Sequence, residues 1–489
     1  MYNILNDLCR SCSFLKGTTM DGKGLFAMTD FNLCDINPNK PVFFVGIGGI
    51  SMSALAQILK NDGYMVCGSD FKESETTVAL KEMGIPVFIG HSGDNVKNAG
   101  LLVYTAAVKE DNPERAAAKQ LGIPAIERAT LLGAMMKNYR YPVAVSGTHG
   151  KTTTTSMLAH ILCAADLDPT ILVGGVLPLI GGNMRDGGKE YFVTEACEYS
   201  ASFLKFFPLY SIILNIEEDH LDFFRDLDDI IKCFKEFVAI LPQNGAVIAN
   251  YDDENVKKAV ENSGKTIISY STQSDSASYR AKNIAFGENG AAEFDVYRKG
   301  DFYFRVKLNV PGLHNVQNAL SVIAASDLLG VSKAAMQAGF SSYKGTNRRF
   351  EYKGKAFGFQ VIDDYAHHPT EIKATLKAAK VVAKENKVWC VFQPHTYTRS
   401  LALKDEFAKA FFDCDGLVVT DIYAAREKDT GLISSKDLVE VIAQNSENAV
   451  YISSFEDVAA YFKEHAKAGD LVITMGAGDV YKIGDLLLK

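Results

Sequence analysis

The chain has 489 residues, of which 47% are hydrophobic and 22% are charged, an ordinary composition for a globular protein. This length is too great for one hydrophobic core, so about three domains are expected. The net charge of -8 argues against general binding to nucleic acid or to an anionic membrane, because either would need a basic surface. No apolar run is long enough to span a bilayer and the N-terminus lacks a secretory pattern, so we expect a cytoplasmic protein.

Residues 1–40 show no clear periodicity, and we treat them as a peripheral arm. Cys9 and Cys12 form a C-x-x-C in this arm. No second pair stands at zinc-site spacing, so a chance pair is favoured over a metal or redox site. The nine cysteines are scattered and odd in number, which is typical of reduced thiols rather than of a disulfide framework.

A strand, a glycine loop and a helix open the next segment. Val42–Val45 is an apolar run, Gly46–Ser51 is the loop, and Met52–Leu59 has a helical pattern. Further short apolar runs stand at Met65–Cys67, Val87–Ile89 and Leu101–Tyr104. This alternation predicts a doubly wound parallel sheet, a Rossmann-like α/β domain over residues 41–140.

The glycine loop of this domain resembles the dinucleotide fingerprint G-x-G-x-x-G. Ser51 occupies the third glycine position, and Asp70 stands at about the distance where an acidic residue meets a ribose. Three interpretations stay open at this point: a nicotinamide-binding loop, a loop for another nucleotide diphosphate, and a tight turn with no ligand.

The stretch Tyr141–Thr155 organises the rest of the chain. Val143–Val145 predicts a buried strand, Gly147–Thr152 is a second glycine loop, and Ser156–Ala165 predicts an apolar helix. Strand, loop and helix in this order are typical of a phosphate-binding unit.

Each residue of this second loop has a physical use at a polyphosphate. Gly147 and Gly150 leave backbone N–H groups free to face an anion, and the helix N-terminus adds its positive dipole end. Lys151 brings a point charge, and Thr152 offers a hydroxyl to magnesium. The alternative, a glycine turn beside an incidental lysine, is disfavoured because these features occur together and in order.

The α/β alternation continues through a central domain over residues 141–343. Strands are expected at Tyr191–Ala196, Ser211–Asn215 and Val247–Asn250, followed by a β-rich section from Thr272 to Val310 and a helix at Leu313–Leu329. A linker at Tyr343–Gly345 leads to a third α/β domain over residues 344–489. Its expected elements are Gln360–Asp363, Glu371–Ala383, Val388–Phe392, Leu401–Phe412, Gly416–Thr420, Leu438–Ala443, Leu471–Met475 and Val480–Leu488.

The second glycine loop departs from a standard P-loop, because Val145 stands where a glycine is usual. This narrower loop resembles that of the Mur ligase family, the ATP-dependent amino-acid ligases of bacterial cell-wall synthesis. Other stretches that agree with the family are Glu195–Glu198, Asn215–Asp222, Gly312–Asn315, Arg348–Phe350 and Asp363–Pro369. The resemblance runs from about residue 41 to the C-terminus.

Within the family, three motifs look most like the member that joins L-alanine to UDP-N-acetylmuramate: Gly46–Met52, Asp364–Pro369 and Gln393–Arg399. Thr396 stands where some members have an arginine. The resemblance implies three domains: a Rossmann-like N-terminal domain for the UDP-sugar, a P-loop ATPase-type central domain, and a Rossmann-like C-terminal domain for the amino acid. It also implies a reaction in peptidoglycan precursor synthesis, in which ATP phosphorylates the muramyl carboxylate and the alanine amine attacks the acyl phosphate.

The resemblance also implies roles for individual residues. The residues carried over to ATP binding are Gly147, Thr148, His149, Gly150, Lys151, Thr152, Thr153, Asn315, Arg349 and Asp364. Those carried over to UDP-sugar binding are Gly46, Gly48, Gly49, Ser51, Ser69 and Asp70. One or two magnesium ions would be held by Thr152, Glu195 and His220, and the alanine pocket would contain Tyr365, His367 and Arg399. The catalytic group would be Lys151, Glu195, His220 and His367, with His367 as a candidate base for the ammonium.

Several residues and alternatives are left open. Glu217, Glu218, Asp219 and Asp222 receive no role, His368 and His395 are taken as structural, and a lysine equivalent to Lys235 is carbamylated in some relatives. His314 and Asn315 are also simple candidates for helix capping. The competing functions are a sister ligase that adds a preformed peptide in cell-wall recycling, a nicotinamide-dependent dehydrogenase, and a nucleotide switch. A monomer or a homodimer is expected.

Overall fold

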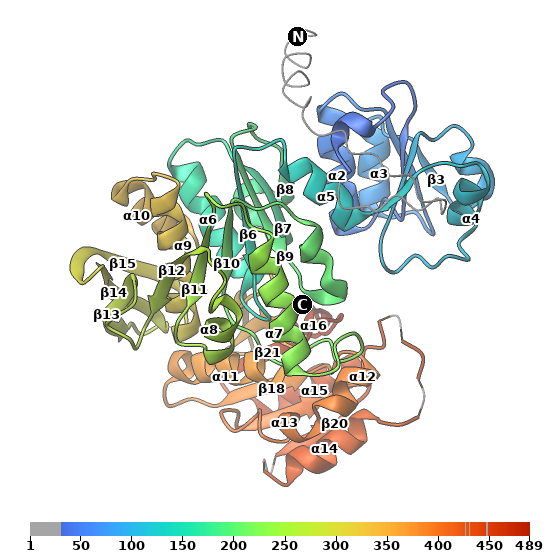
Figure 1. The fold of residues 1–489 in the computed structure, drawn as a ribbon. Coiled ribbons are helices and arrows are strands. Elements are labelled where there is room, and N and C mark those ends of the chain that lie inside the picture. Colours follow the sequence, from blue (N-terminus) through green and yellow to red (C-terminus); the bar gives the residue numbers. More distant parts are fainter. Residues whose placement is uncertain (1–30, 426, 430, 446–447) are drawn as a thin grey trace. The chain divides into compact units, whose positions relative to one another are not determined.

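The computed structural model describes residues 31–425, 427–429, 431–445 and 448–489, and these residues form two units (Figure 1). The first unit holds the described residues up to Tyr139 together with Lys205–Phe207, and the second holds the remainder. The C-x-x-C of Cys9 and Cys12 lies outside the described residues, as does most of the predicted arm. Within the described ranges, no helix has the length and apolar character needed to cross a membrane. The predicted domain boundaries stay predictions.

The first unit contains the predicted doubly wound sheet, with five parallel strands in the order β3-β2-β1-β4-β5 among the described residues. Its strands are β1 (Val42–Val45), β2 (Val66–Asp70), β3 (Val87–Ile89), β4 (Leu101–Tyr104) and β5 (Ala125–Glu127). Its helices are α2 (Ile50–Asn61), α3 (Glu75–Glu82), α4 (Pro113–Gln120) and α5 (Arg128–Met136), with short 3-10 turns η1 (Leu33–Asp35) and η2 (Gly93–Val96). The strand order reverses beside β1, and ligands of such sheets bind where it reverses.

A fully buried carboxylate, that of Glu114 on α4, connects three other polar side chains of this unit. Its Oε2 accepts the Ser69 hydroxyl at 2.7 Å and lies 2.8 Å from Nδ1 of His91. Its Oε1 accepts from the amide of Asn95 at 2.8 Å. Ser69 is itself buried, so its side chain joins β2 to α4 inside the fold, and its predicted role in UDP-sugar binding stays a prediction.

The central sheet of the second unit has ten strands in the described residues, in the order β15-β14-β13-β12-β11-β10-β6-β9-β7-β8. β6 (Tyr141–Ser146) lies in its interior, parallel to β10 (Tyr210–Ile213) and β9 (Tyr191–Ala196). The other strands are β7 (Thr170–Leu177), β8 (Gly182–Arg185), β11 (Ala246–Asn250), β12 (Thr266–Ser271), β13 (Tyr279–Phe286), β14 (Ala291–Arg298) and β15 (Asp301–Pro311). The β-rich section is an antiparallel meander of β13, β14 and β15 at one edge.

The helices beside this sheet are α6 (Lys151–Ala164), α7 (Leu227–Ala239), α8 (Glu254–Val260), α9 (Leu313–Leu328) and α10 (Lys333–Ser342), with 3-10 turns η3 (Pro178–Ile180) and η4 (Tyr199–Lys205). Helix α6 begins at Lys151, five residues before the predicted start. Its run of threonines has weak helix propensity, but Thr152, Thr154 and Thr155 are buried, and packing overrides propensity here.

The third sheet also belongs to the second unit, and its described strands run in the order β16-β17-β21-β18-β19-β20. They are β16 (Glu351–Ala356), β17 (Phe359–Asp364), β18 (Val388–Phe392), β19 (Gly416–Val419), β20 (Ala449–Tyr451) and β21 (Leu471–Met475). Its helices, orange and red in Figure 1, are α11 (Pro369–Ala383), α12 (Tyr397–Ala402), α13 (Lys404–Phe407), α14 (Ser435–Ala443), α15 (Phe455–His465) and α16 (Tyr481–Leu488). Only β16 is antiparallel to its neighbour among the described strands.

The single helix predicted at Leu401–Phe412 is wrong. The chain forms two short helices that meet at Leu403, whose backbone leaves the helical region at φ -105° and ψ 23°. Leu403 and Phe407 are buried, whereas Phe412 is 64% exposed, so the apolar pattern does not follow one helical face. β5, β20 and α15 were not predicted.

Removing the buried Glu114 carboxylate should destabilise the first unit. In a Glu114→Ala variant, Ser69, His91 and Asn95 lose their common partner, and we expect a loss on the order of 3 kcal/mol. Hydrogen exchange of β1 to β5 measures it, with the exposed Glu110→Ala as a control that stays within about 0.5 kcal/mol. Equal protection in both variants would mean that the network carries little stability.

Candidate functional site

The phosphate loop connects β6 to α6 through two glycines with positive φ, Gly147 at 131° and Gly150 at 85°. A Cβ at Gly147 would lie 3.0 to 3.1 Å from atoms of Leu214 and Asn215, and a Cβ at Gly150 would lie 3.0 Å from Oδ1 of Asn318. Both positions therefore need glycine for conformation and for space.

Two N–H groups that lie between the predicted glycines are bonded within the protein. The N–H of Thr148 donates to the Asn215 carbonyl at 3.0 Å, and that of His149 donates to the Asn215 side chain at 2.7 Å. These two groups tie the loop to the end of β10 and are not left free for an anion. The first turn of α6 begins at Lys151 and has no preceding turn to bond to, so its N–H groups are suited to receive an anion.

Lys151 is balanced by a carboxylate to which the sequence analysis gave no role. Its Nζ lies 3.1 Å from Oε2 of Glu198, which is buried, and it also donates to the carbonyls of Gly147 and Thr148. Burial disfavours the charge on Lys151, but Glu198 together with Cys197 and Glu195 outweighs burial and raises the pKa of the lysine. The sequence signal was the spacing of Glu195, near the end of β9, and Glu198 just after that strand.

Thr152 and Glu195, two of the predicted magnesium ligands, both face consecutive glycines of β7. The Glu195 carboxylate accepts the N–H of Gly174 at 2.5 Å, and a Cβ at Gly175 would lie 3.3 Å from Cγ2 of Thr152. A hydroxyl and a carboxylate beside Lys151 are the hard oxygen donors that magnesium prefers. The donor set therefore fits the ion.

His220, the third predicted ligand, follows β10 and has a positive φ of 56°. Its ring packs on Tyr199, with centroids 4.7 Å apart, and its Nε2 lies 3.7 Å from Oδ2 of Asp219. Burial lowers its pKa, while Asp219 and Glu198 act in the opposite direction. A neutral imidazole within the electrostatic reach of Glu198 and Lys151 is compatible with metal binding. Lys235, by contrast, is exposed on α7.

A cavity of about 300 Å³ opens beside the phosphate loop and is lined from both the central and the third sheet regions. This volume falls within the usual range for small-molecule sites. Six of the predicted ATP residues line it: His149, Gly150, Thr153, Asn315, Arg349 and Asp364. Asn315 is braced at both ends of its amide, since Nδ2 donates to Pro311 at 2.7 Å and Oδ1 accepts from Asn318 at 3.2 Å. The cap of α9 is Gly312, so neither His314 nor Asn315 caps that helix.

Asp364 also serves mainly to shape the cavity wall. Its oxygens accept the N–H groups of Phe350 at 2.7 Å and of Ala366 at 2.8 Å. Burial raises its pKa to about 6, although Arg349 and these N–H groups act in the opposite direction. The predicted role of Asp364 in ATP binding therefore competes with a structural use of both oxygens.

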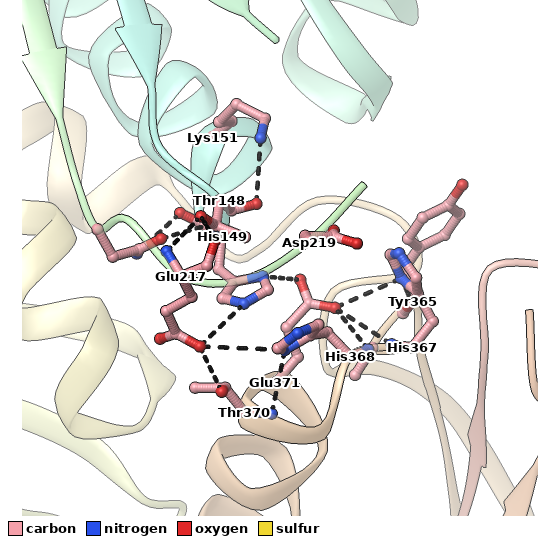
Figure 2. A network of polar contacts seen from close by, with 12 residues as sticks. Thr148, His149, Lys151, Glu217, Asp219, Tyr365, His367, His368, Thr370 and Glu371 are labelled. Atoms are coloured by element: carbon pink, nitrogen blue, oxygen red, sulfur yellow. Dashed lines mark hydrogen bonds and ion pairs between the residues drawn. The ribbon is translucent and has the colours of Figure 1, made fainter. Parts of the chain in front are cut away.

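A group of imidazoles and carboxylates joins the phosphate loop to the start of α11 (Figure 2). Nδ1 of His149 lies 3.2 Å from Oε1 of Glu371, and its Nε2 lies 3.6 Å from Oε2 of Glu217. Burial lowers the pKa of His149, but the two carboxylates outweigh it and raise that pKa to about 10. Glu217, Glu371 and His368 were not assigned to a site from the sequence, because they meet only through the fold.

The three residues predicted for the alanine pocket lie in one region. Tyr365 and His367 have ring centroids 5.5 Å apart, and Nη1 of Arg399 contacts the His395 ring, which packs on His367. Arg399 is already paired, because Nη2 and Nε donate to Oδ1 of Asp219 at 2.8 and 3.1 Å. A substrate carboxylate would have to share or replace this partner.

Two pKa shifts describe the same pocket. Burial favours the neutral form of Asp219, but Arg399 together with His220 and His367 outweighs burial and holds the pKa of this carboxyl well below its usual range. Burial lowers the pKa of His367 to about 3. Burial thus favours the neutral imidazole, and the role of His367 as a base for the ammonium stays a prediction.

In the first unit, the glycine loop after β1 is hydrogen-bonded to the Asp70 carboxylate. Oδ2 of Asp70 accepts the N–H of Gly48 at 2.8 Å, and a Cβ at Gly48 would clash with it at 2.8 Å. Gly46 has a positive φ of 77°, whereas Gly49 and Ser51 are exposed at the start of α2. The loop therefore leaves its helix N-terminus accessible, while the Asp70 carboxylate shapes the loop from within.

Three family models match the chain in sequence order. They are described as Mur ligase family, catalytic domain, over residues 41–140, Mur ligase middle domain over residues 145–326, and Mur ligase, glutamate ligase domain, over residues 348–478. Together they span well over half of the chain. The chain belongs to the Mur ligase family.

Relatives within the Mur ligase family are similar over nearly their whole length. The UDP-N-acetylmuramate–L-alanine ligase of Acetivibrio thermocellus is 53% identical over 94% of this chain and 98% of its own. The UDP-N-acetylmuramate–L-alanine ligase of Clostridium acetobutylicum is 51% identical over 92% of this chain and 98% of its own length. The crystal structure of the UDP-N-acetylmuramate–alanine ligase of Thermotoga maritima has a TM-score of 0.76 and 30% identity over 92% and 98% of the two chains. The three-domain α/β fold expected from the sequence is confirmed.

Neutralising Glu198 should have two opposite effects. A Glu198→Gln variant leaves the buried Lys151 ammonium without its carboxylate, so we expect a loss of stability on the order of 2 kcal/mol. The anionic competitor for the phosphates also disappears, so magnesium-free ATP should bind more tightly by calorimetry. Glu190→Gln, at an exposed surface pair, is the control with almost no effect. Weaker ATP binding with unchanged stability would show that Glu198 does not balance Lys151.

The raised pKa of His149 predicts a pH-dependent contribution to stability. Because the folded pKa is about 10 and the ordinary value is 6.5, the contribution is complete below about pH 6.5 and is lost as the pH rises through 10. In the presence of a chelator, wild type should exceed a His149→Gln variant by on the order of 3 kcal/mol at pH 6. Thermal unfolding at several pH values measures the difference, and the exposed His465→Gln is the control. If the stability difference between wild type and His149→Gln did not change with pH, the raised pKa of His149 would be contradicted.

Proposed function

We propose that this chain is an ATP-dependent ligase that joins L-alanine to the carboxylate of UDP-N-acetylmuramate in peptidoglycan precursor synthesis. The observation that carries the proposal is the 53% identity to a UDP-N-acetylmuramate–L-alanine ligase over 98% of that enzyme, which includes the region of His367 and Arg399. The reaction has two steps. ATP phosphorylates the muramyl carboxylate, and the alanine amine then attacks the acyl phosphate, forms the amide and releases phosphate.

The electrostatics of the central site suit the first step. A carboxylate that approaches the γ-phosphate is repelled, so cationic groups must lie between the two anions. Lys151 carries a buried positive charge at the phosphate loop, and the first turn of α6 supplies aligned N–H donors. ATP phosphates would replace Glu198 as the partner of Lys151. Magnesium bound by Thr152, Glu195 and His220 would neutralise further phosphate charge.

The third domain would supply both an ATP contact and the alanine pocket. Arg349 lines the cavity with its guanidinium 4.9 Å from the Tyr365 ring, which keeps it beside the nucleotide site. Arg399 has the planar fork that suits the alanine carboxylate, and exchanging Asp219 for that carboxylate would couple alanine binding to the loop of His220. His367 would form a wall of this pocket and stays a candidate base for the ammonium.

The UDP-sugar would bind at the glycine loop of the first unit. Gly46, Gly48 and Gly49 lead into α2, whose N-terminus can receive a diphosphate. Asp70 would act indirectly, because its carboxylate is bound to Gly48 within the loop. That use also argues against the nicotinamide interpretation, which needs a free carboxylate for the ribose. A cytoplasmic location and a monomeric or homodimeric state are part of the same proposal.

The second candidate is a ligase for a preformed peptide. The murein peptide ligase of Psychrobacter arcticus has a TM-score of 0.68 and 27% identity to this chain over 92% of it. The relatives named for L-alanine are about 50% identical, which favours the amino acid over the peptide.

Phosphate release from ATP tests the proposal. With UDP-N-acetylmuramate present, L-alanine should stimulate release, whereas other amino acids and the tripeptide should do so weakly. A Lys151→Ala variant should lower kcat by about 1000-fold, because it removes a preorganised charge from the phosphates. Lys232→Ala, at an exposed position on α7, is the matched control with normal kcat. Stimulation by the tripeptide alone would favour the recycling ligase, and no stimulation at all would exclude both.

A further inference from the structure

Three potential metal-binding side chains converge where the phosphate loop meets the third domain. They are His149 of the phosphate loop, Glu217 after β10, and His368 immediately before α11. One ligand atom from each lies within 4.8 Å of the others. The two imidazole rings pack together with centroids 4.7 Å apart (Figure 2). This group is separate from Thr152, Glu195 and His220, the residues proposed for magnesium.

The hydrogen bonds of the two histidines orient one nitrogen of each toward Glu217. Nδ1 of His149 faces the Glu371 carboxylate at 3.2 Å, and Nε2 of His368 faces the Glu218 carbonyl at 2.9 Å. Each of these nitrogens has an acceptor as its partner and must carry a proton. In the neutral rings the lone pairs therefore lie on Nε2 of His149 and Nδ1 of His368. Nδ1 of His368 already accepts the N–H of Thr370 at 3.3 Å as the cap of α11, so an ion would replace this long hydrogen bond. Metal-binding histidines are held in this way, by a carboxylate or carbonyl on the opposite nitrogen.

The distances match a small tetrahedral ion after modest closure. Oε2 of Glu217 lies 3.6 Å from Nε2 of His149 and 4.0 Å from Nδ1 of His368. Metal–ligand bonds of about 2.0 Å place neighbouring tetrahedral ligands about 3.3 Å apart, so each side chain must move by less than about 1 Å. Nε2 of His149 is buried and has no hydrogen-bond partner among the described residues. Such a polar atom needs a partner.

We propose that His149, Glu217 and His368 bind a divalent transition-metal ion of the zinc class. Two imidazoles and one carboxylate are the ligands that Zn²⁺ prefers, whereas a magnesium site is built mainly from oxygen ligands. Glu217 also accepts the hydroxyl of Thr370, which orients the carboxylate as the surroundings of a metal site usually do. A fourth position is left for water, because the Glu217 side chain is 31% exposed.

The bound ion would act as a clamp between two parts of the second unit. His149 and Glu217 belong to the loops after β6 and β10, and His368 caps α11 in the third domain. The backbone of His149 is already fixed by Asn215 through both its N–H and its carbonyl. An ion at this point would therefore hold the phosphate loop against α11. The inference goes beyond the proposed function and does not depend on it.

A proton is the competing occupant. The carboxylates Glu217 and Glu371 create a negative pocket around His149, and an imidazolium would satisfy them without any metal. In that state both nitrogens of His149 carry protons and Nε2 has no lone pair for an ion. The two occupants therefore differ in a property that can be measured directly.

Metal titration of the intact, metal-stripped protein tests the proposal. Zn²⁺ competition against a chromophoric chelator should give one tight site, and Co²⁺ should give the visible absorption of a tetrahedral complex. Glu217→Gln and His368→Asn should each weaken Zn²⁺ binding by about tenfold or more, since each removes a ligand. Asparagine can still cap α11, so the His368 variant keeps the helix start. His220→Asn and His465→Asn are controls that should bind Zn²⁺ like the wild type.

The outcomes separate the alternatives without an activity assay. Nitrogen NMR of wild type should show Zn²⁺ shifting one ring nitrogen each of His149 and His368, even if a variant folds poorly. Loss of Zn²⁺ binding in His220→Asn would overturn the proposal by moving the ion to the magnesium residues. Persistence of both His149 ring protons at saturating Zn²⁺ would overturn it in favour of the imidazolium. Failure of the ligase assay alone would leave these results unaffected.

Discussion

The ammonium of Lys151 must be balanced inside the protein, and much of the central domain is arranged around this requirement. Lys151 follows the loop after β6, near the ends of the parallel strands β9 and β10. The segments that follow β9 and β10 each contribute charged or polar residues. β9 leads to Glu198, which pairs with Lys151, and β10 leads to Asn215, which fixes the phosphate loop. Carboxyl ends of parallel strands meet at one edge, so the sheet itself collects these groups.

The same constraint extends to the third domain. The loop after β10 carries Glu217 and Asp219, and each meets a cationic or titratable partner from beyond residue 344. Asp219 pairs with Arg399, while Glu217 lies between His149 and His368. A nucleotide and an amino acid that entered here would exchange existing partners rather than fill neutral space. Ligand binding at this site would therefore replace existing ion pairs. The charged side chains of these pairs have already been removed from water by the fold.

Motifs that lie within one short stretch could be predicted well. Val42–Val45, Tyr191–Ala196 and Val388–Phe392 were predicted with their observed bounds, because buried parallel strands are short continuous apolar runs. The two glycine loops were also recognised from local spacing, since their glycines answer local conformational needs. The start of α6 was placed too late and Leu401–Phe412 was given one helix, because in both places burial decides against local propensity.

The sequence by itself determined the strand–loop–helix units, the charge of the phosphate loop and the resemblance to Mur ligases, since these depend on neighbouring residues. Only the tertiary structure decided which side chains are free to meet a ligand. In this structure the Asp70 carboxylate accepts the N–H of Gly48, and the buried Ser69 hydroxyl donates to Glu114. Lys151 forms an ion pair with Glu198. The tertiary structure also brought His149, Glu217 and His368 together from separate segments. The physical reason is that hydrogen bonds and ion pairs depend on distance in space, and residues far apart in sequence become neighbours only when the sheets form.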